Sequence, residues 1–133
     1  MIVYFCSPFA GAAGGSQFDR ETEQALNEEF TRQCCREIAL TGVTVFAPHL
    51  FFPLFLRDAD EVERARGIES GLEIMSVSRE VWFRLPSWRS DHSRGMKQER
   101  MSAESMGKPI VLIDHSSDRW VTNIHRLRDQ LHR

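Results

Sequence analysis

Short runs of apolar residues alternate with longer amphipathic stretches along this chain, and this alternation limits its possible folds more than any other feature. The apolar runs cover residues 2–6, 43–46, 77–83 and 110–113. Such short continuous runs are typical of strands that are buried on both faces of a sheet. Helical patterns follow over residues 18–40, 58–75, 93–103 and 118–131. The order β-α-β-α-β-α-β-α predicts an α/β fold, a Rossmann/flavodoxin-like three-layer sandwich with a central parallel sheet of four to five strands and right-handed crossovers.

Three of the helical stretches carry an apolar residue every three to four positions, which is the spacing of one buried helix face. We expect the first helix to bury Phe18, Thr22, Ala25, Leu26, Phe30, Cys34 and Ile38. We expect the second to bury Val62, Ala65, Ile68, Leu72 and Met75, and the last to bury Val121, Ile124, Leu127 and Leu131. Cys34 is therefore assigned to packing and not to chemistry.

The bulk properties fit a single domain over residues 1–133 and exclude several classes of protein. The net charge of −2 gives no basic surface for a nucleic acid polymer. The apolar start, Met1 to Cys6, is too short to cross a membrane and lacks the positive flank of a signal peptide, so we expect a strand and no membrane segment. The three cysteines include the adjacent Cys34 and Cys35, which fits a reducing, cytoplasmic location better than a disulfide framework. No residues have the spacing of a metal site, so no metal is expected.

The stretch that starts at Ser93 combines the features of an anion site with a carboxylate. Ser93 is a good N-cap for the following helix, and Gly95 lets the backbone approach a ligand closely. The free N–H groups of such a helix start bind anions, for example phosphate. At helical spacing Ser93, Met96 and Glu99 fall near one side, so a carboxylate would lie beside the anion. The alternative is an amphipathic helix with a solvated glutamate.

Loops that follow the other strands belong to the same edge of the predicted sheet, where ligands gather. Residues 7–16 are rich in glycine and small side chains, and they form either a loop that holds phosphate or ribose or a plain flexible turn. His49 follows the second strand and is either a ligand-binding side chain or a structural hydrogen-bonding residue. Trp88 follows the third strand and is either a lid that stacks on a ring or a half-buried anchor.

Residues 50–56 are unusually apolar for a connection between two elements. Pro53 argues against a central strand, so we expect an extended or one-turn segment. Such a segment packs on the sheet, covers the site, or meets a second subunit. The third possibility predicts a homo-oligomer, a dimer or larger, with this segment at the interface.

Three blocks of sequence resemble the nucleoside 2-deoxyribosyltransferase superfamily, which includes the related 2'-deoxynucleoside 5'-monophosphate N-glycosidases. The blocks are Tyr4-Phe5-Cys6-Ser7-Pro8-Phe9-Ala10-Gly11, Ala47-Pro48-His49-Leu50, and Ser93-x-Gly95-x-x-x-Glu99 with Ala103 and Gly107-Lys108-Pro109. The chain is also similar to small bacterial and phage proteins of this superfamily that carry a Pro-His-Leu-Phe-Phe-Pro-type segment. The resemblance extends from the first strand to the fourth.

The resemblance implies an enzyme that cleaves or transfers the N-glycosidic bond of a nucleoside or nucleoside 5'-monophosphate. Glu99 takes the place of the family's helix glutamate, which attacks the anomeric carbon to form a covalent glycosyl-enzyme that water or a second base resolves. The implied substrate-binding residues are Ser7, Pro8, Phe9 and Gly11 of the first loop, His49, and Ser93, Gly95 and Met96, with Ser93 beside the 5'-phosphate. The resemblance implies no cofactor, and it implies a homo-oligomer because neighbouring subunits often complete the site in this superfamily.

One position departs from the family pattern. The superfamily usually carries an acidic residue at the end of the third strand, which assists the sugar and the leaving base, and Arg79 stands at the matching position, next to Glu80. Either Glu80 or Asp91 acts as the second catalytic residue, or the chemistry is impaired, because general acid catalysis contributes about 10²–10⁴-fold. Two alternatives to an enzyme follow. One is a non-catalytic nucleotide-binding or sensor module, and the other is a structural or assembly protein that uses residues 51–56 as an interface.

Overall fold

A computed structural model of the chain describes residues 1–11, 17–113 and 120–132. Its elements are β1 (Ile2–Cys6), α1 (Gln17–Leu40), β2 (Thr44–Phe46), α2 (Pro48–Phe51), the short 3-10 helix η1 (Phe52–Leu54), α3 (Glu61–Val77), β3 (Glu80–Arg84), α4 (Arg94–Ser105), β4 (Ile110–Ile113) and α5 (Trp120–Leu131). Residues 12–16 of the predicted first loop, the predicted start of the last helix at residue 118, and the side chains of Phe18 and Val121 lie outside this description.

The four strands form one sheet in the order β2-β1-β3-β4, and every neighbouring pair is parallel. This confirms the predicted α/β fold with its parallel sheet. The chain leaves β1 toward one edge strand, β2, and leaves β3 toward the other edge strand, β4. The connections that follow β1 and β3 therefore run in opposite directions, which places a crevice at the carboxyl edge of the sheet.

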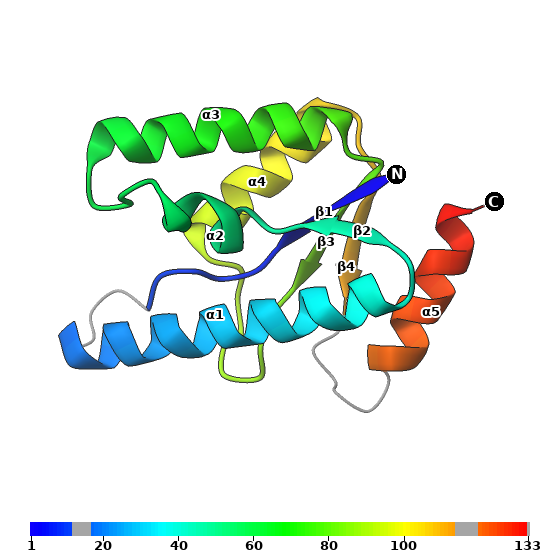
Figure 1. Cartoon of the computed structure of the whole chain (residues 1–133), viewed down its shortest axis with the longest axis horizontal. Helices are drawn as coiled ribbons and strands as arrows, with labels where there is room; N and C mark the ends of the chain where they lie inside the picture. The colour runs from blue at the N-terminus through cyan, green and yellow to red at the C-terminus, as the bar shows by residue number, and fades with distance from the viewer. Residues whose placement is uncertain (12–16, 114–119, 133) are drawn as a thin grey trace.

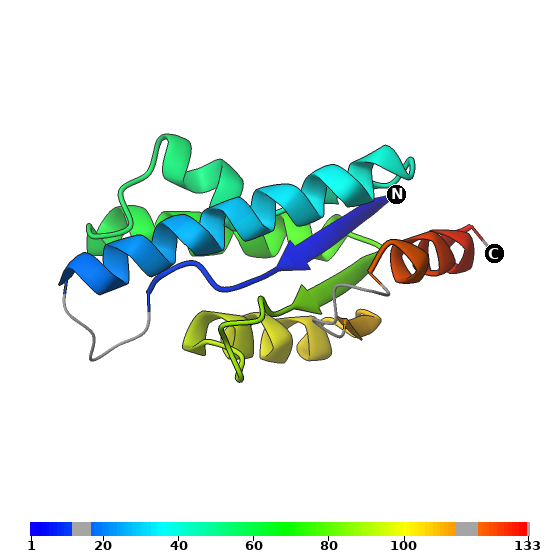
Figure 2. The same ribbon diagram turned by 90° about the horizontal axis from the view of Figure 1, so that it is seen from below.

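Helices cover both faces of the sheet, because successive side chains of a strand point to opposite faces. Val3 and Phe5 of β1 pack in a core cluster with residues of α1 and α5. Tyr4 and Cys6, the alternate residues of the same strand, pack in a second cluster with residues of α3 and α4. Figure 1 shows the resulting three layers, with α3 and α4 above the sheet and α1 and α5 below it, and Figure 2 shows β1 and β3 running in the same direction.

The buried stripe of α1 differs from the predicted one in the first half of the helix. It consists of Asn27, Thr31, Cys34 and Ile38, whereas Thr22, Ala25 and Leu26 are exposed. The prediction was wrong there because it followed apolar residues, while the helix buries polar side chains that have hydrogen-bond partners. Toward the end of the helix, Cys34 and Ile38 are buried in the core as predicted.

The predicted inner face of the second long helix is also wrong in its first half. In α3, Val62 is 79% exposed and Ile68 is 52% exposed, and the buried residues are Gly71 and Met75. Gly71 lets Tyr4 and Phe52 pack closely against α3. A Cβ at this position would lie 3.1 Å from the hydroxyl oxygen of Tyr4 and 3.7 Å from the Phe52 ring. In α5, by contrast, Ile124, Leu127 and Leu131 are buried as predicted.

The third strand starts later than its apolar pattern predicts. Val77 is the last residue of α3, and the Ser78 hydroxyl donates to the carbonyl of Ile74, so the helix continues into the predicted strand. Arg79 precedes β3, is exposed, and donates its backbone N–H to the carbonyl of Ile2 at 2.7 Å. Arg79 therefore lies at the amino edge of the sheet, and the interpretation that it occupies the end of the third strand is wrong.

The apolar connection at residues 50–56 lies in two short helical turns, α2 and η1. Of the two predicted forms, extended or one-turn, the structure has the one-turn form. Within the ranges that the structure describes, no helix has both the length and the apolar composition that a bilayer crossing requires.

Candidate functional site

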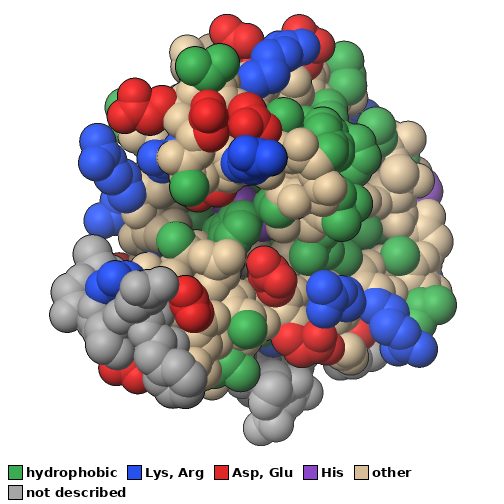
Figure 3. Space-filling model, turned by 60° about the vertical axis from the view of Figure 1, so that its left-hand side comes forward, with side chains coloured by type: hydrophobic (Ala, Val, Ile, Leu, Met, Phe, Trp, Pro, Cys, Tyr) green, Lys and Arg blue, Asp and Glu red, His purple; other side chains and the backbone are tan. Residues whose placement is uncertain are grey.

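A cavity of about 390 Å³ opens at the carboxyl edge of the sheet, where the topology predicts a crevice. Its walls come from the connection after β1, from α2 and η1, from one side of α3, and from the connection between β3 and α4 together with the start of α4. The volume is that of a small-molecule site. Figure 3 brings this face forward and shows hydrophobic side chains gathered beside a hollow, with charged side chains around them.

Glu99 extends from α4 to the wall of this cavity and meets the end of β1. Its Oε2 accepts a hydrogen bond from the thiol of Cys6 at 3.3 Å. Its Oε1 is buried and has no hydrogen-bond partner among the described residues. Burial raises the pKa of Glu99 to about 7, and the Cys6 thiol and the nearby Tyr4 hydroxyl offset part of this rise. Near neutral pH the carboxyl is thus poised between its acid and its carboxylate.

Tyr4 and Cys6, two residues apart and so on the same face of β1, lie next to this carboxyl. Burial and the neighbouring Glu99 raise the pKa of the Tyr4 hydroxyl and that of the Cys6 thiol. Both groups therefore keep their protons at neutral pH and act as donors. Because donors favour the charged form of a carboxylate, β1 supplies the polar contacts that a buried Glu99 anion needs.

The start of α4 has the predicted N-cap. The hydroxyl of Ser93 accepts a hydrogen bond from the backbone N–H of Met96 at 3.3 Å. Ser93, Arg94 and Gly95 all line the cavity, and a Cβ at Gly95 would meet nothing within 4 Å, so the backbone is open to a ligand here. A helix start with free N–H groups favours a negatively charged ligand.

Cationic side chains outnumber carboxyl groups around the cavity. Four arginines line it, Arg57, Arg64, Arg89 and Arg94, against three acidic residues, Asp58, Glu63 and Glu99. Arg89 is held by an ion pair with Glu23 of α1 at 3.0 Å, and the two side chains are 17% and 21% exposed. The balance of charge and the start of α4 both favour an anionic group.

His49 lies in α2 and lines the cavity beside the first loop. Its ring packs edge-on against Phe9, with ring centroids 4.9 Å apart. Burial lowers the pKa of His49 to about 4, so the ring is neutral near pH 7. A neutral imidazole offers one donor and one acceptor to a ligand, and carries no charge that would attract phosphate.

Asn27, which the sequence patterns did not single out, joins two walls of the site. It is fully buried in α1. Its amide donates to the carbonyls of Phe9 and Ala10 at 3.2 and 3.3 Å, and its Oδ1 accepts from the indole N–H of Trp88 at 2.9 Å. This hydrogen bond fixes Trp88 to α1, which agrees with the predicted role of a half-buried anchor. The signal was the spacing of Asn27 and Thr31 ahead of Cys34 and Ile38, which continues the buried stripe of a helix.

Six of the predicted site residues line the cavity: Glu99, Phe9, Gly11, His49, Ser93 and Gly95. A Cβ at Gly11 would overlap the backbone of Arg20, so this loop requires glycine. Three others lie behind the wall, because Ser7, Pro8 and Met96 are buried in the core and Ser7 is hydrogen-bonded to Thr31. These three shape the wall from below and do not present side chains to a ligand in the cavity.

Glu80 lies apart from these residues. It is the first residue of β3, at the amino edge of the sheet, and its Oε1 accepts from the indole N–H of Trp82 at 2.9 Å. The resemblance to the family placed Glu80 near the site, because it matched Arg79 to the end of the third strand, whereas β3 begins at Glu80. Glu80 is therefore not brought together with Glu99 at the carboxyl edge.

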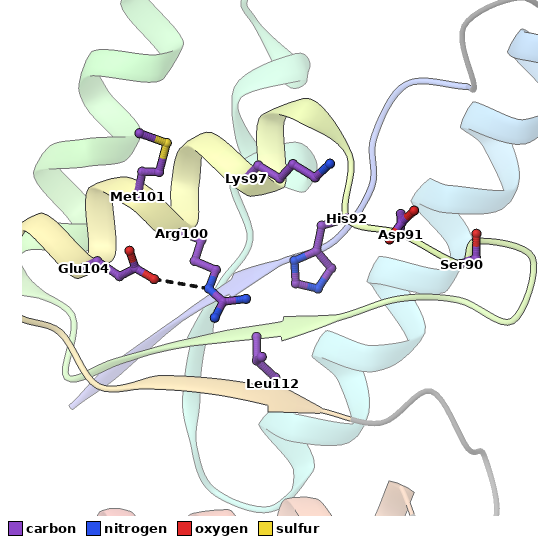
Figure 4. A pocket seen from close by; sticks show the side chains of 8 residues that line it. All are labelled: Ser90, Asp91, His92, Lys97, Arg100, Met101, Glu104 and Leu112. Atoms are coloured by element: carbon purple, nitrogen blue, oxygen red, sulfur yellow. Dashed lines mark hydrogen bonds and ion pairs between the residues drawn. The ribbon is translucent and has the colours of Figure 1, made fainter.

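Asp91, the other predicted acid, lines a separate open groove of about 520 Å³ between α4 and the edge strand β4. Figure 4 shows Lys97, Arg100, Met101 and Glu104 projecting from α4 above Leu112 of β4, with the Arg100–Glu104 ion pair at 3.3 Å. His92, at the centre of the view, stacks on Phe83 with ring centroids 5.6 Å apart. This groove mixes charges of both signs and contains neither Glu99 nor Ser93, so we place the candidate site in the cavity.

Within the described part of the chain, no three His, Cys, Asp or Glu side chains come together as ligands for a metal ion. The titratable and charged groups that line the cavity are carboxyl groups, a tyrosine hydroxyl, the His49 imidazole and arginines, and the Cys6 thiol lies behind Glu99.

Comparison with known proteins gives a family and a fold. The model of a domain of unknown function, DUF7768, matches residues 1–113. No curated protein matches the chain in sequence. Among solved structures, the chain is similar to a 2-deoxyribosyltransferase from the psychrotolerant bacterium Bacillus psychrosaccharolyticus, with a TM-score of 0.60 and 19% identity. The similarity covers 88% of this chain and 74% of that one, and at this identity it is a similarity of fold.

Proposed function

This chain belongs to the DUF7768 family, and we propose that it cleaves or transfers the N-glycosidic bond of a (deoxy)nucleoside or a nucleoside 5'-monophosphate, with Glu99 as the nucleophile. The observation that carries the proposal is the carboxyl of Glu99 at the cavity wall, with Oε2 held by Cys6 and Oε1 buried without a partner. A fold shared with a 2-deoxyribosyltransferase supports the same chemistry.

In the proposed first step, Oε1 of ionised Glu99 attacks the anomeric carbon of the sugar. A carbon–oxygen bond forms as the carbon–nitrogen bond to the base breaks, and the bonding electron pair leaves with the base, which takes a proton from water. In the second step, water or an acceptor base attacks the same carbon and restores the carboxylate, while the attacking group releases a proton to solvent. This is the double displacement of a retaining glycosidase.

The cavity supports a substrate that carries phosphate. Ser93, Gly95 and the open N–H groups at the start of α4 would hold the 5'-phosphate, with Arg89 and Arg94 as charged donors. Phe9 and His49 would contact the sugar and base from the other side. The order of preference that we expect is therefore nucleoside 5'-monophosphate over free nucleoside.

Release of free base tests this function. The protein is incubated with a panel of 2'-deoxynucleosides and their 5'-monophosphates, with and without an acceptor base, and products are separated by chromatography. We expect release that is lost in Glu99→Gln. The matched control is Glu104→Gln, on the same helix but with its carboxyl on the outer groove, which should retain full activity. Equal release by wild type and Glu99→Gln would contradict the proposal.

A nucleotide-binding or sensor module on the same fold is the second candidate. It is favoured by the positions of Glu80 and Asp91, since neither predicted acid lines the cavity that contains Glu99. Without a general acid, a leaving base is expelled about 10²–10⁴-fold more slowly. A clear thermal shift on adding a nucleoside 5'-monophosphate, with no base released over a long incubation, would favour this candidate.

A further inference from the structure

The two oxygens of the Glu99 carboxyl have different surroundings. Oε2 accepts a hydrogen bond from Cys6 Sγ at 3.3 Å, whereas Oε1 is buried and has no partner among the described residues. A carboxylate attacks with one oxygen at a time, so a donor that occupies one oxygen also selects the other. The surroundings of Glu99 therefore distinguish its two oxygens.

Cys6 is rigidly placed for this contact. It is the last residue of β1, its side chain is fully buried, and its backbone pairs with Phe83 of β3 in the centre of the sheet. Burial and the nearby Glu99 raise the pKa of the thiol, so the sulfur keeps the proton that it donates. Cysteine is a weak donor, but in a buried site a bond to a charged acceptor is strengthened by the low dielectric.

We propose that Cys6 is a positioning residue for the glycosyl-transfer reaction: its thiol fixes Oε2 of Glu99 and leaves Oε1 as the atom that attacks the anomeric carbon. This inference rests on the proposed function and adds a residue to it. The thiol itself forms no bond to the substrate and loses no proton in either step. Its effect is on the orientation and ionisation of Glu99.

Other charged or titratable groups face the same cavity, and the test must separate them from Cys6. Tyr4 comes from the same strand, His49 from α2, Arg89 from the connection after β3, and Arg94 from α4 itself. The α3 side contributes Arg57, Asp58, Glu63 and Arg64. Of all these groups, Tyr4 is the one that joins Cys6 in acting on the pKa of Glu99. Tyr4→Phe is therefore the comparison variant.

The experiment measures the ionisation of Glu99 with and without the thiol. The carboxyl carbon signal of Glu99, identified by its loss in Glu99→Gln, is followed by NMR against pH in wild type, Cys6→Ala, Cys6→Ser and the comparison variant Tyr4→Phe. Cys6→Val, which removes the donor but fills the space, replaces Cys6→Ala if the smaller side chain does not fold. The pH profile of kcat/KM for base release is recorded for the same proteins.

We expect removal of the donor in Cys6→Ala to raise the pKa of Glu99 by about one pH unit. The acid limb of the kcat/KM profile should move upward by the same amount, and Cys6→Ser, which keeps a donor, should restore the wild-type profile. An unchanged pKa and profile in Cys6→Ala would overturn the inference. The pKa of Glu99 could also rise in Cys6→Ala while the wild type releases no base from any substrate. That result would support the hydrogen bond but overturn both its role in the reaction and the proposed function.

Discussion

At the scale of single residues, Glu99 is buried, although its proposed role as nucleophile requires a charged carboxylate. Its ordinary pKa is 4.5 and its pKa in the folded chain is about 7. Between these values the unfolded chain releases a proton that the folded chain keeps, so the free energy of unfolding falls as pH rises from about 4.5 to about 7. A nucleophile must be ionised, and the fold is therefore less stable in the pH range where Glu99 can act.

The variant Glu99→Gln removes this cost and tests it without any substrate. The change in the free energy of unfolding that Glu99→Gln causes should be more favourable above pH 7 than at pH 4. We expect the difference between the two pH values to reach about 3 kcal/mol. Chemical denaturation at pH 4 and pH 8 measures the difference. Glu104→Gln, a change to an exposed carboxyl on the same helix, is the control. The same change in both variants would contradict the assignment of the raised pKa to Glu99.

The same titration predicts the pH dependence of catalysis. Because the ionised carboxylate attacks in the proposed mechanism, kcat/KM for base release should rise with pH up to about 7 and then level off. His49, with a pKa of about 4, stays neutral over this range and should not add a second limb near neutrality. A profile that falls as pH rises through 7 would indicate that the protonated form of Glu99 is the active one.

At the scale of secondary structure elements, α1 carries the contacts that hold the two loops of the site together. Glu23, Asn27 and Thr31 follow one another at helical spacing and reach the connections after β1 and β3. The polar ridge takes the place of the apolar stripe that periodicity predicts for this part of the helix. The loops are thus fixed by a helix that contributes few groups to the cavity itself.

Replacement of Asn27 tests this arrangement. Asn27→Ala leaves the indole N–H of Trp88 and two loop carbonyls without their buried partner, and we expect a loss of about 2–3 kcal/mol of unfolding free energy. Leu26→Ala is the matched control, because Leu26 is 49% exposed and its truncation should cost less than about 1 kcal/mol. A larger loss of unfolding free energy for Leu26→Ala than for Asn27→Ala would contradict this arrangement and favour the predicted apolar stripe.

The sequence predicts elements here better than it predicts which faces they bury. The order of strands and helices, the N-cap Ser93, and the meeting of Glu99, His49 and Phe9 all follow from local patterns and parallel topology. Asn27 escapes prediction because a buried amide depends on partners that lie 17 to 61 residues away in the chain. Arg79 and Glu80 are misplaced because the resemblance matched Arg79 to the end of the third strand, whereas α3 extends through Val77 and β3 begins only at Glu80.

At the scale of the whole molecule, exposed apolar side chains lie beside the mouth of the cavity. Phe51, Leu54 and Phe55 are 44%, 78% and 59% exposed, and the neighbouring Phe52 and Pro53 line the cavity. Rings of Phe46, Phe51, Phe52 and Phe55 pack on one another, so the patch is continuous with the core. We propose that a second copy of the chain covers this patch in a homo-oligomer.

Charge placed on the patch should separate the subunits. We expect Phe55→Glu to sediment as a monomer, while Val77→Glu, an equally exposed apolar position at the far end of α3, should keep the oligomeric state of the wild type. Analytical ultracentrifugation at several concentrations makes the comparison. Wild type and Phe55→Glu that sediment alike would exclude this patch as the interface.

The central claim is that Glu99 forms a covalent bond to the sugar, and the intact mass of the protein during turnover tests it most directly. A nucleoside 5'-monophosphate whose release of base is established is mixed with the enzyme without an acceptor, quenched in acid, and analysed by mass spectrometry. We expect an increase equal to the mass of the dehydrated sugar phosphate, located on the peptide that contains Glu99 and absent from Glu99→Gln. Base release that continues in Glu99→Gln, or an adduct on any other residue, would contradict the account.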